Sequence, residues 1–340
     1  MPPPPQDTPT PVGPGGEIAF YPLPPEYFDP SNASDEELRY FGLPLPMEFA
    51  GNPAAAAFRR AFLRPRPNAP PLRFLLGVDQ LFADQLPGVV TLAAQASQPV
   101  QKSMNWSGGY VAPRGGRSLT SVMANWTVPV VSAPPGGTAP EYQSSTWIGL
   151  DGQKLYLDSS LPQIGTRQRW LTQPSARADY SSWFQWWARG RHVPQQDLAL
   201  PVDPRDEISA IITVLDETTV RCNLKNASKS IILQAFNARA PAGLRISGAT
   251  AEWIMERPSP LGSDGWEPYD LPAYTGLSFN NCLAESVSSG SAQLQQHDLE
   301  EARLIRMYEI AGNPMRTRTI STARRALGAP QGLELSYLAP

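Results

Sequence analysis

Residues 207–215 read Glu207-Ile208-Ser209-Ala210-Ile211-Ile212-Thr213-Val214-Leu215, and this stretch decides the fold class. It is rich in β-branched residues and offers no helix cap, which is typical of a strand. Similar β-branched and aromatic runs, separated by turn residues, continue from about residue 105 to the C-terminus. Because no helices alternate with these runs, the sequence predicts an all-β domain, either a sandwich or a barrel.

The other expected strands follow one another along this region. They cover residues 121–131, 142–150, 180–187, 219–224, 230–236, 250–256, 276–282, 303–310, 316–321 and 332–338. The run at 304–310 fits a helical period as well as a strand period. The strands expected on either side favour a strand there too.

Residues 1–100 have a different composition and are rich in proline. Ser34 and Glu37 have the spacing of a capping box and predict a short helix that ends near Phe41. Pro53 begins a second predicted helix over residues 54–63. The sequence therefore divides into a Pro-rich arm, residues 1–100, and a β domain, residues 101–340. The arm is expected to be either a propeptide that masks the site or a linker or permanent packing arm.

Charge and composition exclude several classes of function. A formal net charge of -3 gives no electrostatic footprint for nucleic acid or for an anionic membrane. No apolar run reaches transmembrane length, and no signal peptide is recognisable at the N-terminus. Cys222 and Cys282 could form one disulfide, and two cysteines with two distant histidines argue against a metal site. His192 and His297 lie in no triad-like context, so neither receives a role.

The first candidate catalytic residue lies in the stretch Thr250-Ala251-Glu252-Trp253-Ile254-Met255-Glu256-Arg257-Pro258. As a strand, it sends alternate side chains to opposite faces. Trp253 then anchors one face in a core, while Glu252 lies on the opposite, more polar face. A carboxylate on a rigid strand suits a catalytic acid or base, although many ordinary strands also show one.

Two further stretches accompany it. The first, Ser144-Ser145-Thr146-Trp147-Ile148-Gly149-Leu150-Asp151-Gly152, ends in an Asp-Gly turn and is followed by Leu161-Pro162-Gln163-Ile164-Gly165. The second, Tyr180-Ser181-Ser182-Trp183-Phe184-Gln185-Trp186-Trp187, has apolar residues on both faces. An aromatic-walled groove would account for that second pattern.

These residues resemble the glutamic peptidases, also called eqolisins or the G1 peptidase family. The resemblance extends from about residue 101 to the C-terminus. It rests on an ordered set of motifs: Asn105-Trp106-Ser107-Gly108, residues 147–152, Gln163-Ile164-Gly165, the aromatic strand 183–187 and Ala251-Glu252-Trp253-Ile254. The resemblance implies a sandwich of two antiparallel sheets of the concanavalin or lectin-like kind.

The resemblance also implies an activity and its residues. We expect an acid-acting endopeptidase, secreted and made as a zymogen, that cleaves polypeptides as a monomer without a cofactor. The catalytic pair of the family falls on Gln163 and Glu252. Its substrate-binding residues fall on Trp147, Asp151 and Gln185, the last at a position where many family members have Glu.

Elementary chemistry is consistent with such a pair. Hydrolysis by water needs a base that takes the proton of the water and later gives it to the leaving nitrogen. A Glu whose pKa is not shifted by its surroundings, at about 4.3, can do this in acid. A Gln amide can donate to the developing oxyanion and does not titrate.

Two alternatives remain open from the sequence. One is a lectin-like sandwich that binds carbohydrate through Trp147, Trp183 and Trp187 without catalysis. The other is a glycosidase, which requires two carboxylates about 5–10 Å apart across a cleft. Glu252 opposite an amide argues against the glycosidase.

Overall fold

Strand β12 (Glu207–Asp216) confirms the prediction made from its β-branched residues. Ile208, Ala210 and Ile212 point into the main hydrophobic core. Ile211 points the other way and packs in a second cluster with residues of the N-terminal helices. Successive side chains of a strand point in opposite directions. Both faces of β12 are covered by other residues, which explains why both are apolar.

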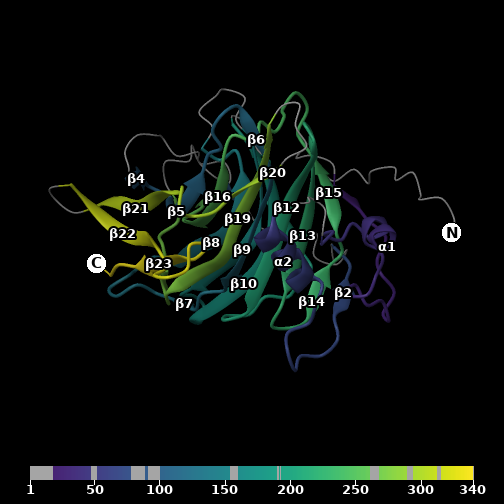
Figure 1. The fold of residues 1–340 in the computed structure, drawn as a ribbon. Helices are drawn as coiled ribbons and strands as arrows, with labels where there is room; N and C mark the ends of the chain where they lie inside the picture. Colours follow the sequence, from purple (N-terminus) through teal and green to yellow (C-terminus); the bar gives the residue numbers. More distant parts are fainter. Residues whose placement is uncertain are drawn as a thin grey trace.

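Two layers of mainly antiparallel strands form a sandwich, as the sequence and the resemblance predict (Figure 1). The structure is a computed structural model that describes residues 18–46, 52–77, 89–90, 100–153, 160–189, 191, 193–260, 268–288, 294–311 and 315–339. None of the helices in these ranges is long and apolar enough to cross a membrane.

The first layer carries the candidate site. Its strands pair in the order β11 (Gln196–Leu198), β10 (Arg177–Ala188), β9 (Ser160–Leu171), β8 (Glu141–Leu150), β16 (Ala251–Glu256), β5 (Trp106–Val111) and β21 (Arg303–Ala311). Strand β21 also pairs with β4 (Val100–Ser103) and β22 (Arg316–Arg325).

The second layer has β12 near its centre. Its strands pair in the order β1 (Ile18–Phe20), β15 (Phe236–Arg239), β13 (Thr219–Asn226), β12, β6 (Arg117–Thr127), β19 (Leu277–Ser288) and β20 (Leu294–His297). Strand β13 also pairs with β14 (Ile231–Leu233), and β14 with β2 (Arg73–Leu75). Strand β23 (Leu333–Tyr337) pairs with both β19 and β22 and so joins the two layers.

Two small ribbons stand beside the layers. Strand β3 (Val89–Val90) pairs with β17 (Ser259–Pro260), and β7 (Val131–Ser132) pairs with β18 (Ala273–Tyr274). The first ribbon brings the backbone of the N-terminal region next to the chain that leaves β16.

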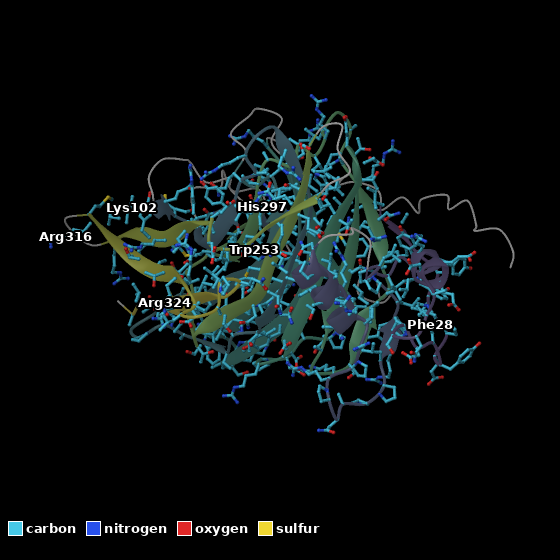
Figure 2. The ribbon with its side chains drawn as sticks, in the orientation of Figure 1. Phe28, Lys102, Trp253, His297, Arg316 and Arg324 are labelled. Carbon is cyan, nitrogen blue, oxygen red and sulfur yellow. The ribbon has the colours of Figure 1, made fainter. Side chains whose placement is uncertain are left out.

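The main core lies between the layers, and two tryptophans tie them together. Trp253 of β16 is labelled near the centre of the molecule in Figure 2, and its Nε1 donates to the carbonyl oxygen of Met123 on β6 at 3.1 Å. Trp126 Nε1 of β6 donates to Thr166 Oγ1 on β9 at 3.1 Å. Each ring therefore spans the core with its polar atom satisfied in the opposite layer. Cys222 and Cys282 are buried in this core as free thiols, so the disulfide that the sequence allows is not formed.

Both predicted helices are confirmed, the first with its predicted capping box and the second with Pro53 at its start. Helix α1 (Asp35–Tyr40) has Ser34 as N-cap, and Ser34 and Glu37 form the full capping box. Helix α2 (Pro53–Phe62) has Pro53 in its first turn. Asn52 caps it, with its side chain accepting from the N–H of Ala55 at 3.2 Å.

The N-terminal region is more deeply integrated than a Pro-rich arm with short helices. It also contributes strands β1, β2 and β3, which the sequence does not predict. Both helices lie near β12–β15 (Figure 1), where their apolar residues pack against Met123, Ile211 and Leu283. These three residues point away from the main core, so α1 and α2 cover the outer face of the second layer. The first layer carries Glu252, and the helices therefore lie on the side of the sandwich away from it.

Candidate active site

Gln163 and Glu252 lie in one row across the first layer. Gln163 of β9 pairs with Gly149 of β8, and Gly149 pairs with Glu252 of β16. Directly paired residues of antiparallel strands project to the same face. Gln163 and Glu252 therefore project from the same face of the layer, on either side of Gly149. The row continues to Gln185 on β10 and to Tyr110 on β5.

Neighbouring side chains fill the space over Gly149, between Gln163 and Glu252. Two strand spacings of about 4.8 Å put the Cα atoms of Gln163 and Glu252 about 10 Å apart. A Cβ on Gly149 would lie 2.7 Å from Leu161 Cδ1 and 3.0 Å from the ring of Trp147. Only glycine fits at this point of the row without displacing its neighbours.

Strand β9, which carries Gln163, is a long strand that the sequence does not predict. The motif 161–165 suggests a turn setting, because it contains Pro162 and Gly165. Instead, Gln163 lies inside a twelve-residue strand. Pairing between β8 and β9 ends at Gln163, so Pro162 lies beyond that ladder and needs no N–H for it. Gly165 lies between Trp147 and Trp183 in the next row. A Cβ on Gly165 would lie 2.3 Å from the carbonyl oxygen of Thr146 and 2.6 Å from Trp147 Cβ, so only glycine allows this close approach to β8.

A chain of amide hydrogen bonds orients Gln163. Gln185 Nε2 donates to the carbonyl oxygen of Val193 at 2.7 Å. Gln185 must therefore direct its Oε1 elsewhere, and that oxygen accepts from Gln163 Nε2 at 3.1 Å. A carbonyl can only accept, so this chain fixes which end of each amide carries the N–H groups.

The carboxyl group of Glu252 is buried and partly satisfied. Its Oε1 accepts from the N–H of Gln153 at 3.2 Å. Thr250 and the N–H of Gly152 also hydrogen-bond to the group. Its Oε2 has no hydrogen-bond partner among the residues that the structure describes. One carboxyl oxygen is thus held in place while the other is available to a ligand or water.

Burial raises the pKa of Glu252 to about 8, and the nearby charge of Asp151 also raises it. The hydrogen bonds from Thr250, Gly152 and Gln153 act in the opposite direction. The sequence-based expectation of an unshifted carboxyl therefore does not describe this state, in which Glu252 and Gln163 are both 0% exposed. Desolvation disfavours the charged form, so Glu252 is protonated here at acidic and neutral pH.

Asp151 holds the backbone that leads into β16. Its Oδ2 accepts from the N–H of Ser247 at 2.6 Å, and its Oδ1 accepts from the N–H of Ala249 at 2.6 Å. Asp151 adopts a left-handed backbone conformation, with φ of 68°, which is typical of Asp in a tight turn. Because both of its oxygens are engaged, Asp151 positions the start of β16 and influences Glu252 by its charge.

Trp147 lies on the same face as the pair, and Glu256 holds it. Trp147 Nε1 donates to Glu256 Oε2 at 2.8 Å. The Trp147 ring packs edge-on against that of Trp106, with 5.1 Å between the ring centroids. Both belong to a cluster with other buried residues of this face: Tyr110, Leu161, Trp183, Trp187, Ile254 and Ile305. The face of Glu252 is therefore largely aromatic and not the polar face that the sequence suggests.

This packing bears on the two alternative functions. Trp147, Trp183 and Trp187 are buried against one another and do not form an exposed platform for a sugar. A glycosidase would pair Glu252 with a second carboxylate such as Asp151. Both oxygens of Asp151 instead accept the backbone N–H groups of Ser247 and Ala249.

His297 has an environment that the sequence does not reveal. Its Nε2 lies 2.7 Å from Ser286 Oγ, and its Nδ1 lies 3.4 Å from Glu301 Oε2. The order serine, histidine, carboxylate is that of a hydrolase triad. However, Ser286 is fully buried, and Arg117 Nε also donates to its Oγ at 2.9 Å. We therefore interpret this group as a structural hydrogen-bond network. His192 lies outside the described residues.

The structure thus brings Gln163, Gln185, Glu252 and Trp147 to one face, with Asp151 supporting β16. All five of these predicted site residues are buried. The described residues contain no group of acidic, histidine or cysteine side chains that could hold a metal ion.

Comparisons with known proteins identify the fold and the family of this chain. A search of curated protein sequences finds no match. Scytalido-glutamic peptidase with a transition-state analogue inhibitor superimposes with a TM-score of 0.52 at 18% identity, over 69% of this chain and 98% of that chain. SCP-B, a member of the eqolisin family in complex with a tripeptide, has a TM-score of 0.50 at 18% identity, with the same coverage. Such distant likenesses show the fold.

The family itself is shown by sequence. The profile of the peptidase A4 family matches residues 104–325, which contain every candidate site residue and most of both layers. The chain is therefore a peptide hydrolase that belongs to the peptidase A4 family, the glutamic peptidases.

Proposed function

We propose that this chain is an acid-acting endopeptidase in which Glu252 and Gln163 act together on one peptide bond through an activated water. One observation carries the proposal: both side chains project from the same face on either side of Gly149. Leu161 and Trp147 pack over Gly149 in this state. Once they move aside, a substrate carbonyl and a water placed over Gly149 would lie between a carboxyl group and an amide.

Glu252 would act first as the base. Its Oε2 is the oxygen without a described partner, so it is the atom that would accept the proton of the water. The oxygen of the water then attacks the carbonyl carbon, and the carbonyl oxygen becomes an oxyanion. Gln163 Nε2 would donate to that oxyanion, and its hydrogen bond to Gln185 Oε1 would fix which end of the Gln163 amide carries the N–H groups.

Glu252 would act second as the acid. The proton taken from the water passes from Glu252 to the nitrogen of the tetrahedral intermediate. The carbon–nitrogen bond then breaks, and a carboxylic acid and an amine leave. The amide of Gln163 keeps the same protonation state throughout, so acid does not disable it.

Acid activity would require the site to open. In the buried state the pKa of Glu252 is about 8, so Glu252 cannot act as a base in acid. Burial is the largest cause of that shift. Entry of water and substrate would reduce desolvation and lower the pKa toward its ordinary value, where the carboxylate exists in mild acid. We infer that opening precedes catalysis.

Cleavage assays on an unfolded protein substrate between pH 3 and 7 test the proposal. We expect Glu252→Gln to lose activity by about 10²–10⁴-fold, the range of general acid–base catalysis. Gln163→Ala should reduce kcat by about 10²–10³-fold. Glu217→Gln, at an exposed carboxylate, and Gln195→Ala, at an amide outside the site, serve as matched controls. Full activity in either site variant would refute the assignment.

A further inference from the structure

A second site lies at the other end of β16, away from Glu252. A pocket of about 630 Å³ is bounded there by the beginning of β8, the β21–β22 hairpin, β23 and the loops at 134–138 and 268–271. Arg257, which directly follows β16, lines it. Arg257 is five positions along the chain from Glu252, which is about 16 Å at 3.3 Å per residue. The volume is within the range of pockets that hold small molecules.

Arg257 is a buried cation whose hydrogen-bonding capacity is unused. It is only 5% exposed. Its Nε is buried without a partner, and its ion-pair contact, between Nη1 and Glu309 Oε2, is 3.8 Å long. That distance exceeds a hydrogen bond. Among the described residues, the guanidinium donates no hydrogen bond that would offset its loss of hydration.

Desolvation of Arg257 also affects its pKa. Burial lowers the pKa of this guanidinium, although Glu309 and Asp270 act to raise it. A buried polar group without partners calls for an explanation, because leaving it unsatisfied costs free energy. A carboxylate ligand would supply the missing acceptors, since the planar guanidinium matches a carboxylate with two parallel N–H donors.

The charges around the pocket indicate what else the ligand carries. Two cations, Arg257 and Arg318, line it together with two acids, Asp270 and Glu309. Glu309 is already paired with Arg318, whereas the exposed Asp270 has no ion pair among the described residues. A simple anion would leave this balanced set negative. A ligand with both a carboxylate and an ammonium would satisfy Arg257 and Asp270 together and preserve the balance.

The remaining walls suit a short apolar side chain. They include Pro134, Leu271 and Ile320, with the rings of Tyr142 and Tyr337. We propose that this pocket binds a zwitterionic amino acid or short peptide, with its carboxylate at Arg257, its ammonium at Asp270 and its side chain against these walls. A peptide hydrolase generates ligands of this class as its own products.

Calorimetric titration of the full chain at pH 6.5, where both termini of a dipeptide are charged, tests the proposal. The ligands are alanyl-leucine, its C-terminal amide, its N-acetyl form and free leucine. We expect saturable one-to-one binding of alanyl-leucine, and affinity for the amide lower by at least about tenfold. Weaker binding of the N-acetyl form would support the role of Asp270, and comparison with leucine shows whether an amino acid suffices. Equal affinity for the free acid and the amide, or no saturable binding up to about 10 mM, would overturn the proposal.

Substitutions locate the binding to the pocket. Arg257→Met should weaken alanyl-leucine binding by at least about tenfold, while Arg306→Met, at an exposed arginine outside the pocket, should leave it unchanged. Asp270→Asn should weaken binding of the free dipeptide and not of its N-acetyl form. Removal of an unsatisfied buried cation should not lower the melting temperature, so Arg257→Met is expected to fold. Wild-type affinity in Arg257→Met would place the ligand elsewhere.

Discussion

Gln163 Nε2 donates to Gln185 Oε1 over 3.1 Å, and Gln185 itself is held by the carbonyl oxygen of Val193. The nitrogen that we assign to the oxyanion is therefore oriented by a residue that does not contact the reacting atoms. Gln185 is thus a positioning residue in the proposed reaction.

Gln185→Leu should lower kcat with little change in KM. Without its acceptor, the Gln163 amide can rotate and present oxygen in place of nitrogen to the oxyanion. We expect a loss of about tenfold to a hundredfold, less than removal of the donor itself. Gln185→Glu keeps an acceptor for Gln163 and should retain more activity than the leucine variant. Steady-state kinetics from pH 3 to 7 would measure both, and an unchanged kcat in Gln185→Leu would contradict the positioning role.

Glu252 should make the folded protein less stable as the pH rises. Its pKa is about 8 when folded and near 4.5 when exposed, so the folded state holds a proton that the unfolded state releases. The resulting stabilisation is complete below about pH 4.5 and is lost as the pH rises to about 8, a change on the order of a few kcal/mol. Glu252→Gln lacks this titration.

Denaturant unfolding of wild type and Glu252→Gln at pH 4, 6 and 8 tests this prediction. The two proteins should have similar stability at pH 4, and the variant should become the more stable one at pH 8. Parallel stability curves across this range would show that Glu252 is not protonated in the folded state.

The buried ion pair between Arg59 and Glu285 should be costly to break. Arg59 of α2 meets Glu285 of β19 with both side chains almost inaccessible, and Ser121 Oγ also donates to Glu285 at 2.7 Å. Arg59→Met or Glu285→Gln alone should destabilise by about 3–5 kcal/mol, because a charge remains buried without its partner. The double variant Arg59→Met/Glu285→Leu should recover much of that loss.

The exposed pair Arg39–Asp35 provides the matched comparison. Arg39→Met should cost less than about 1 kcal/mol, since water screens exposed pairs. Thermal or denaturant unfolding measures all of these variants. Equal costs at the two sites would mean that the burial of Arg59 and Glu285 has no energetic consequence.

Residues 18–75 should stay with the sandwich if the N-terminal region is processed. Lys225 of β13 donates to the carbonyl oxygen of Phe62 at 2.8 Å and to that of Ala61 at 3.2 Å, so it caps the C-terminal end of α2 from the second layer. The strand pairing of β1 and β2 adds backbone hydrogen bonds. Because α1 and α2 cover the layer without Glu252, they are not placed to mask the proposed pair of Gln163 and Glu252.

Mass spectrometry after incubation in acid would test the attachment of this region. Any cleavage near the domain boundary is expected between residues 76 and 100, with the fragment that contains residues 18–75 remaining bound on gel filtration. Deletion of residues 1–75 should lower the melting temperature, because it exposes Met123, Ile211 and Leu283. A stable, fully active protein without these residues would identify them as a dispensable propeptide.

The fold could be predicted largely because its signals are local. The β-branched run of β12 and the capping box of α1 depend on neighbouring residues, and the structure confirms both. The twelve-residue strand β9 was not predicted because Pro162 and Gly165 are typical of turns. In the structure, Pro162 lies just beyond the β8–β9 pairing, and Gly165 allows a close approach to Trp147. Strands β1 and β2 escaped because three residues give too short a period to read.

The candidate site could be predicted residue by residue but not as an arrangement. The motifs indicate Gln163 and Glu252, but only the register shows that Gly149 lies between them. The pKa of Glu252 and the environment of His297 depend on burial and on residues distant in sequence. The same holds for Arg257, because no local pattern reveals that an arginine lacks partners.

Strand β23 gives the sandwich a mechanical property. Because it pairs with β22 on one side and β19 on the other, the two layers are a single sheet folded over on itself. A pulling force applied at the C-terminus would load the hydrogen-bond ladders of both layers at once. We therefore expect β23 to transmit an applied force from one layer to the other.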